Sequence, residues 1–245
     1  MCKTVQRGYS PNDKTEFYGD AYPRLLTAGQ DLRYLLDRGY PIKVASTFVG
    51  NHFLLSERQR LALARAVSSS DNIESRRKKE QTALPQGSVV HIDGFNTVIT
   101  LEVALSRSLL LKCMDGTVRD LAALRGTYRL IDKTAPAISL IGDMLERYGI
   151  GKAVFYLDAP VSNSGRLKEQ IQTVLGQAPF EVQAEVIHNV DTTLEKLENV
   201  ITSDAIILDK CISWINLNSR IIEESMEAYP YVDFSVLACR PNDCL

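Results

Sequence analysis

The stretch VVHIDG, residues 89–94, decides the fold, because it is a strand-like apolar run that stops at an aspartate and a glycine. The pattern returns further along the chain as AVFYLD at 153–158, EVIHNVD at 185–191 and VITSD at 200–204. The carboxyl ends of parallel strands meet at one edge of an open sheet, where ligands collect. We therefore expect the aspartates that end these runs to converge there. They are Asp93, Asp158, Asp191 and Asp204.

Strand-like runs alternate with helix-like runs from residue 88 onward. The strand-like runs lie near 88–93, 108–113, 152–158, 182–190, 199–203 and 231–238. The helix-like runs lie near 96–106, 134–149, 164–176, 192–198 and 204–227. This alternation is typical of βαβ units. It predicts an α/β domain over residues 88–245, with a parallel sheet that has helices on both faces.

Residues 1–67 are predicted to form a small all-helical domain ahead of the sheet. Leucines at helical spacing stop at RGYP, residues 38–41, where glycine and proline end a helix. Ser56 and Gln59 form a capping-box pattern at the start of a later helix. The strings LDRGYP, VGN and RQR, at 36–41, 49–51 and 58–60, resemble an uncharacterised, mainly archaeal domain of unknown function. That resemblance implies no activity.

The segment 68–87 is polar and contains the cationic run RRKK at 76–79. We expect a basic linker here. Such a run is either a solvated hinge or a surface that follows a phosphate backbone.

The chemistry of the four aspartates has two readings. A single aspartate at a strand end is more often a helix cap, and Asp191 and Asp204 each precede a helix-like run. Asp93 and Asp158 are harder to explain as caps, because each ends a strongly apolar run. Carboxylates held together repel unless a cation neutralises them, and hard oxygen ligands suit Mg²⁺ or Mn²⁺. As a set, the four favour the divalent-metal site of a phosphodiesterase.

These motifs resemble a known family. IDGFN at 92–96 resembles the D-G-x-N signature that opens NYN-type domains of the PIN-like nuclease superfamily, and VITSD at 200–204 resembles the T-S-D that ends a later strand of that fold. FYLD at 155–158 and Asp191 are similar to the second and third acidic positions. The resemblance covers residues 86–240. This chain departs from the pattern in the long stretch between Asp93 and Asp158.

The resemblance implies a PIN-like domain that acts as a metal-dependent nuclease, a hydrolase with RNA as its substrate. Asp93, Asp158 and Asp204 would bind Mg²⁺ or Mn²⁺, with Asp191 as an additional or water-mediated ligand. Four further side chains are expected to hydrogen-bond phosphate or to hold the carboxylates in place. They are Asn96, Ser162, Asn163 and Ser203.

Two other functions remain open at this point. One is a PIN-like module that binds nucleic acid or a nucleotide without cleaving it, in which the aspartates are caps. The other is a phosphatase-like enzyme with Asp93 as nucleophile. Phe95 stands where that enzyme class needs a second aspartate, which disfavours the phosphatase.

The insertion between Asp93 and Asp158 contains a second group of polar residues, around the segments 115–120 and 125–129. Arg119, Arg125 and Arg129 are candidates to clamp phosphate and so to bind substrate. The alternative is a turn stabilised by internal aspartate–arginine pairs.

Composition narrows the function classes. The formal net charge is −2, but residues 1–80 carry an excess of Lys and Arg and the remainder an excess of Asp and Glu. This asymmetry fits a nuclease with one phosphate-holding part and one metal-holding part, and it fits equally a variation of surface charge between domains. No apolar run is long enough to cross a membrane, and the five cysteines form no C-x-x-C pair, which favours reduced thiols in a cytoplasmic protein. No P-loop, G-x-G-x-x-G or G-x-S-x-G motif occurs, which argues against a P-loop NTPase, a dinucleotide enzyme of the usual kind and a serine hydrolase. The sequence leaves open whether the protein forms a homo-oligomer.

Overall fold

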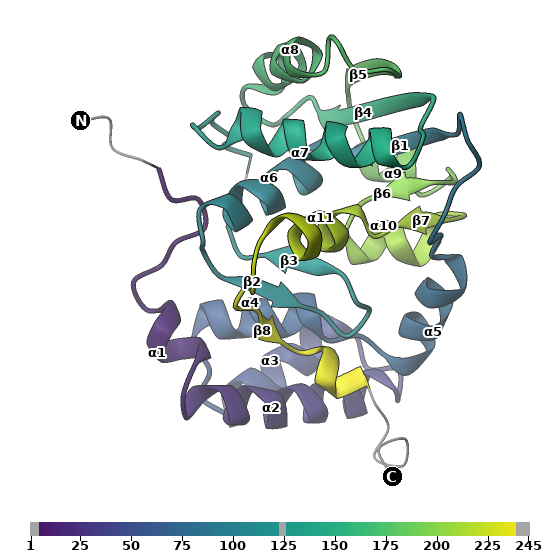
Figure 1. Cartoon of the computed structure of the whole chain (residues 1–245). Helices are drawn as coiled ribbons and strands as arrows, with labels where there is room; N and C mark the ends of the chain where they lie inside the picture. Colours follow the sequence, from purple (N-terminus) through teal and green to yellow (C-terminus); the bar gives the residue numbers. More distant parts are fainter. Residues whose placement is uncertain (1–4, 123–125, 239–245) are drawn as a thin grey trace.

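The computed structural model describes residues 5–122 and 126–238, and its larger part is built on a parallel sheet (Figure 1). The strands of this sheet follow the order β5-β4-β1-β6-β7, and every neighbouring pair is parallel. Their bounds are β1 Val89–Asp93, β4 Lys152–Asp158, β5 Glu181–Ile187, β6 Val200–Ile201 and β7 Trp214–Ile215. The α/β fold with a parallel sheet is therefore confirmed.

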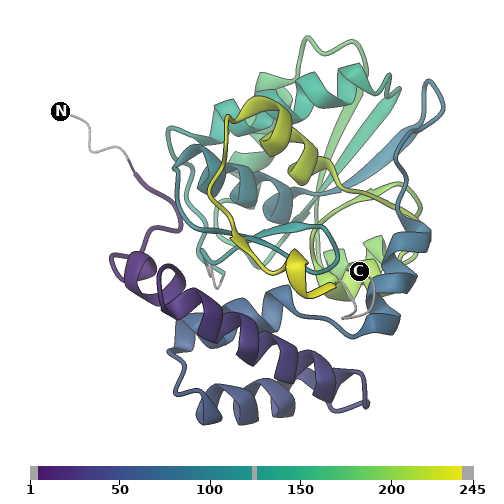
Figure 2. The same ribbon diagram turned by 60° about the horizontal axis from the view of Figure 1, so that its bottom comes forward.

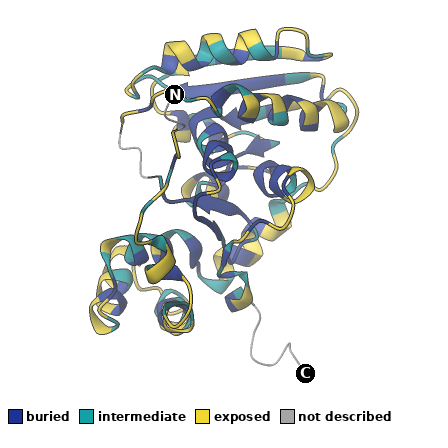
Figure 3. Cartoon of the chain, turned by 60° about the vertical axis from the view of Figure 1, so that its left-hand side comes forward, coloured by how far each residue is buried: buried dark blue, intermediate teal, exposed yellow. Residues whose placement is uncertain are grey.

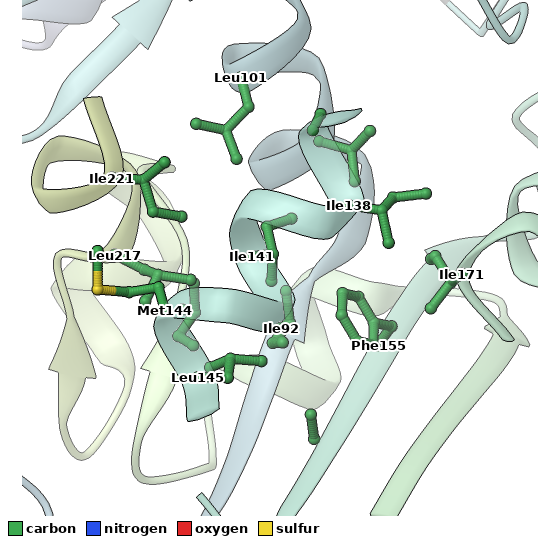
Figure 4. Close-up of a cluster of buried hydrophobic side chains, with 14 of the residues drawn as sticks. Ile92, Leu101, Ile138, Ile141, Met144, Leu145, Phe155, Ile171, Leu217 and Ile221 are labelled. Atoms are coloured by element: carbon green, nitrogen blue, oxygen red, sulfur yellow. The ribbon is translucent and has the colours of Figure 1, made fainter. Parts of the chain in front are cut away.

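Helices cover both faces of this sheet. One face packs against α6 Gly94–Leu105, α7 Thr134–Arg147, α8 Ser164–Val174 and α11 Leu217–Ser225. The other packs against α9 Val190–Leu194 and α10 Ala205–Lys210. Because strand side chains alternate between faces, Phe155 belongs to the first core and Val154 to the second. Figure 4 shows Ile92 and Phe155 of the strands among side chains of α7 and α8. The inner strands β1 and β4 are mostly buried, whereas the edge strand β5 and the outer faces of the covering helices are more exposed (Figure 3).

A second, smaller sheet lies beside the first. It contains β2 Leu110–Lys112, β3 Val118–Asp120 and β8 Val232–Asp233, in the order β3-β2-β8. β2 pairs antiparallel with β3 and parallel with β8. The sequence had placed the runs 108–113 and 231–238 in the main parallel sheet, and that expectation is wrong. β2 and β3 follow α6 in the chain, and β8 follows α11. These strands pair with one another and not with a strand of the main sheet.

The amino-terminal region is helical, as expected. It consists of α1 Asp13–Phe17, α2 Ala21–Leu36, α3 Ile42–His52 and α4 Glu57–Ala66. The capping box at the start of α4 is present, with Ser56 and Gln59 each accepting the other's backbone N–H. One apolar cluster joins these helices to the second sheet, through Leu111 of β2 and Phe234 after β8. The helices lie against that sheet in both views (Figures 1 and 2).

Two local predictions fail. The expected linker contains a helix, α5 Ser70–Lys79, whose first turn is capped by Ser69. The expected helix 204–227 is broken into α10, β7 and α11, because Trp214 is buried and its indole donates to the carbonyl of Arg76 over 2.8 Å. Within the described residues, no helix is long and apolar enough to cross a lipid bilayer.

Candidate functional site

Asp93 lies at the junction between β1 and α6. It is buried, and its Oδ1 accepts the backbone N–H of Asn96 over 3.4 Å, so it caps the helix. Glycine is required at the next position because a Cβ on Gly94 would lie 2.6 Å from Leu157 Cδ2 and 3.0 Å from the carbonyl oxygen of Tyr156. The D-G pair thus brings the start of α6 tightly against β4.

The turn Thr202-Ser203-Asp204 lies beside Asp93. The Thr202 hydroxyl donates to Asp93 Oδ2 over 2.9 Å and accepts the backbone N–H of Asp204 over 3.0 Å. Asp204 Oδ1 in turn accepts the N–H of Ile206 over 2.7 Å, capping α10. One hydroxyl group therefore joins the carboxylate of Asp93, at the end of β1, to the backbone of Asp204, after β6. The sequence had not singled out Thr202, although its place in the T-S-D string is a local signal.

Asn96 and Ser203 bind each other. The side-chain oxygen of Asn96 accepts both the backbone N–H of Ser203, over 2.9 Å, and its hydroxyl, over 2.8 Å. This contact fixes the first turn of α6 against the turn before α10. Of the two roles expected for these residues, the geometry supports holding the carboxylates in place.

Asp158 and Asp191 come from β4 and α9. Asp158 ends β4 and accepts a hydrogen bond from the backbone N–H of Val190. Asp191 is the second residue of α9, and β5 has already ended at Ile187. The expectation that Asp191 directly ends a strand is wrong, because Asn189 takes a left-handed conformation and turns the chain into the helix.

The carboxylates influence one another electrostatically. Burial raises the pKa of Asp93 to about 7, and the charges of Asp204 and Asp158 act in the same direction, against the hydrogen bonds from Thr202 and Asn96. Although Asp191 lies at the surface, partial burial raises its pKa, as do the charges of Asp204 and Asp158. Burial also raises the pKa of Asp158. All four aspartates thus belong to one electrostatic group.

The metal-binding capacity of this group is limited by its geometry. Among residues 5–122 and 126–238, no three His, Cys, Asp or Glu side chains lie close enough together to hold one ion. Mg²⁺, however, keeps several waters and is commonly bound by only one or two carboxylates together with substrate phosphates. Asp93 and Asp204, whose carboxylates are near enough to influence each other's charge, fit that smaller set of ligands.

Ser162 and Asn163 hold a loop. The Ser162 hydroxyl accepts the N–H of Tyr128 over 3.0 Å and donates to its carbonyl oxygen, which also accepts the side-chain amide of Asn163 over 2.6 Å. These bonds attach the backbone around Tyr128 to the start of α8. The contacts of both residues are thus structural in this state of the protein.

The three candidate clamp arginines differ in their surroundings. Arg119 is buried, and its guanidinium donates to the carbonyl oxygens of Ser203 and Arg65 and to Asp115 Oδ2. Arg129 is exposed. Arg125 lies outside the described residues. The contacts of Arg119 match the structural alternative to a phosphate clamp, a turn stabilised by an internal aspartate–arginine pair.

Asp115 is the centre of a buried ionic cluster. Its Oδ2 accepts from Arg76 over 2.6 Å and from Arg119 over 2.5 Å, and Arg76 also donates to Asp209 of α10 over 2.7 Å. Although burial alone would raise the pKa of Asp115, Arg119 and Arg76 hold it below the ordinary value. Arg76 belongs to the cationic run that was expected to be either a solvated hinge or a phosphate-binding surface, and both expectations are wrong for this residue because it is buried.

A cleft of about 950 Å³ opens next to Asp204. The main-sheet region contributes Asn96, Ser203, Asp204 and Ile206, and the helical region contributes residues from the α2–α3 turn and from the α4–α5 connection. Sequence reasoning missed this cleft because its two walls come from segments far apart in the chain.

Comparison with known proteins places the chain in a family. Residues 24–79 match a family described as "Protein of unknown function (DUF434)". An uncharacterised protein of Methanocaldococcus jannaschii is 37% identical over 182 residues, which cover 74% of this chain and 87% of that protein. No solved structure matches the chain. Residues 83–220, more than half of the chain, match the family described as "Domain of unknown function (DUF5616)", and the chain therefore belongs to that family.

Proposed function

We propose that this protein is a divalent-metal-dependent nuclease that hydrolyses RNA phosphodiester bonds at the carboxyl edge of its parallel sheet. The observation that carries the proposal is the link from Asp93 through the Thr202 hydroxyl to Asp204. It joins the Asp93 carboxylate to the backbone of Asp204, and the charge of Asp204 acts on Asp93, so the two residues lie together where open α/β sheets bind their ligands.

Asp93 and Asp204 would hold Mg²⁺ or Mn²⁺, whereas Asp158 and Asp191, which form no three-ligand group with them among the described residues, would reach the ion through water. When bound, such an ion lowers the pKa of water and stabilises negative charge on phosphate oxygens. The chain's own residues would keep the carboxylates in position. Thr202 orients Asp93, and the Asn96–Ser203 contact fixes the two turns relative to each other.

The choice of RNA and of phosphodiester hydrolysis rests on the resemblance of the D-G-x-N and T-S-D strings to NYN-type PIN-like domains. A cytoplasmic location fits the buried free thiols of Cys113 and Cys211, which would persist in a reducing compartment.

A second candidate is a module that binds nucleic acid or a nucleotide without cleaving it. It is favoured by the absence of a three-ligand acidic group among the described residues and by the fact that Asp93 and Asp204 both cap helices. A cap needs no metal, so metal-dependent cleavage separates the two candidates.

The test is RNA cleavage by the purified protein with Mg²⁺, with Mn²⁺ and with EDTA. Asp93→Asn and Asp204→Asn keep the shape of the side chain but remove its charge, and each should abolish cleavage that EDTA also abolishes. Asp143→Asn, at an exposed site on α7, is the matched control and should retain wild-type activity. Cleavage that persists in both site variants would overturn the proposal, and wild-type RNA binding without cleavage would support the second candidate.

A further inference from the structure

The cleft beside Asp204 is lined by more aspartates than arginines, whereas surfaces that bind nucleic acid are usually positively charged. The arginines that line it are Arg65, Arg76 and Arg119, and each donates to groups of the protein itself. Its aspartates are Asp37, Asp71, Asp120, Asp204 and Asp209. Surfaces that hold phosphates carry uncommitted Lys and Arg. The arginines of this cleft are therefore not available to hold a phosphate backbone.

Apolar and aromatic side chains are exposed in the same cleft. Tyr40 is 53% exposed and Ile42 is 40% exposed, and both lie at the turn between α2 and α3. Ile206 of α10, two residues after Asp204, is 57% exposed. A tyrosine ring with aliphatic neighbours offers a face on which a planar base can stack, a contact worth about 1–3 kcal/mol per base.

Amide groups of the cleft remain available for hydrogen bonds. Asn96 uses its side-chain oxygen for Ser203, and Asn72 uses its side-chain nitrogen for Asp209. Among the described residues, the NH₂ group of Asn96 and the side-chain oxygen of Asn72 have no partner. A donor and an acceptor of this kind can pair with the edge of a base, which presents both.

We propose that the cleft binds one unpaired nucleobase of the substrate strand, stacked on Tyr40, while the adjoining phosphate lies at the edge of the cleft formed by Asp204, next to Asp93. The volume of about 950 Å³ leaves ample room, since pockets for small ligands measure roughly 300–1,000 Å³. The proposal rests on the proposed function for the position of the phosphate, but the base site itself needs no metal. It gives the helical region a role, because Tyr40 belongs to that region.

The test uses the four ribonucleoside 5′-monophosphates and ribose 5-phosphate, each titrated into the full-length protein in EDTA and followed by the backbone amide signals in NMR. At least one nucleotide should shift signals around Tyr40 and Ile206, and ribose 5-phosphate should not. Tyr40→Ala should weaken nucleotide binding by about fivefold or more, the equivalent of a lost stacking contact. Tyr40→Phe should keep wild-type affinity, because the ring remains.

Two controls complete the design. Tyr34→Ala removes an exposed tyrosine of α2 that lines a different hollow, and should bind as wild type does. Ile206→Ser tests the opposite wall and should weaken binding. Equal shifts with ribose 5-phosphate, no binding of any nucleotide, or unchanged affinity in Tyr40→Ala would each overturn the base site. Because EDTA is present throughout, failure of metal-dependent cleavage leaves this result unaffected, and the two proposals can fail separately.

Discussion

The Thr202 hydroxyl donates a hydrogen bond to Asp93 Oδ2 over 2.9 Å, across the boundary between β1 and the turn that follows β6. Both residues are buried, so the bond acts with little competition from water. It favours the ionised form of Asp93 and opposes the effect of burial on the pKa of that carboxyl.

Removing this bond should raise the pKa of Asp93. We expect Thr202→Val, which keeps the shape and loses the hydroxyl, to raise it above the wild-type value of about 7. Thr202→Ser keeps the donor and should leave the pKa close to wild type. The pKa of Asp93 can be measured in all three proteins from the chemical shift of its carboxyl carbon as a function of pH. A pKa in Thr202→Val equal to or below that of wild type would refute the assigned role.

The raised pKa of Asp93 predicts a specific pH dependence of stability. Without metal, between about pH 4 and pH 7 the folded protein retains a proton that the unfolded chain has lost, so the free energy of unfolding falls as pH rises through this window. The loss is at most about 1.4 kcal/mol per pH unit. Asp93→Asn cannot ionise, so its Tm relative to wild type should be higher at pH 8 than at pH 5. Parallel Tm curves for the two proteins would contradict this.

The ionic cluster around Asp115 should matter more for stability than any surface pair. Asp115→Asn leaves the guanidinium group of Arg119 buried without a carboxylate and leaves Arg76 with Asp209 alone, and we expect a loss of about 3–5 kcal/mol. Glu224→Gln breaks the exposed pair with Arg147 and should cost less than about 1 kcal/mol. Urea denaturation measures both. Similar losses in the two variants would show that the cluster contributes no more than a surface pair.

Gly94 should not tolerate a side chain. In Gly94→Ala the new methyl group would collide with Leu157 and with the backbone of Tyr156, and we expect a clear fall in Tm. Gly165 lies in α8 with open space around its Cα, so Gly165→Ala should be neutral or stabilise the protein by up to about 1 kcal/mol. Thermal denaturation distinguishes them. A Gly94→Ala protein as stable as wild type would mean that the close approach of α6 to β4 is not required.

The sequence predicted those elements of the fold whose pattern lies within a short stretch of neighbouring residues. β1 and β4 are runs of consecutive apolar residues, and the α4 capping box is contained in four residues, so both could be read from the sequence. β7 has only two residues and exists because it pairs with β6 and because Trp214 bonds to Arg76. Such a strand has no pattern of its own.

The candidate site divides in the same way. The D-G-x-N and T-S-D strings located Asp93 and Asp204, because each of these carboxylates caps a helix that begins next to it in the chain. Asn96 and Ser203 were located with them because they stand in the same two strings, although their side chains bond to each other across the site. Arg76 could not be placed, since its partners Asp115 and Asp209 lie 39 and 133 positions away. A run of four cations is expected to be exposed to solvent unless it is known that carboxylates far away in the sequence pair with one of them.

The most direct test of the central claim is calorimetric titration of Mn²⁺ into the metal-free protein at pH 8, where Asp93 is ionised. We predict that wild-type protein and Asp143→Asn bind Mn²⁺ with the same affinity, and that Asp93→Asn and Asp204→Asn bind it at least about tenfold more weakly, because each loses a charged ligand. Wild-type protein that takes up no Mn²⁺, or site variants that bind it as wild type does, would contradict the assignment of these aspartates to a metal site.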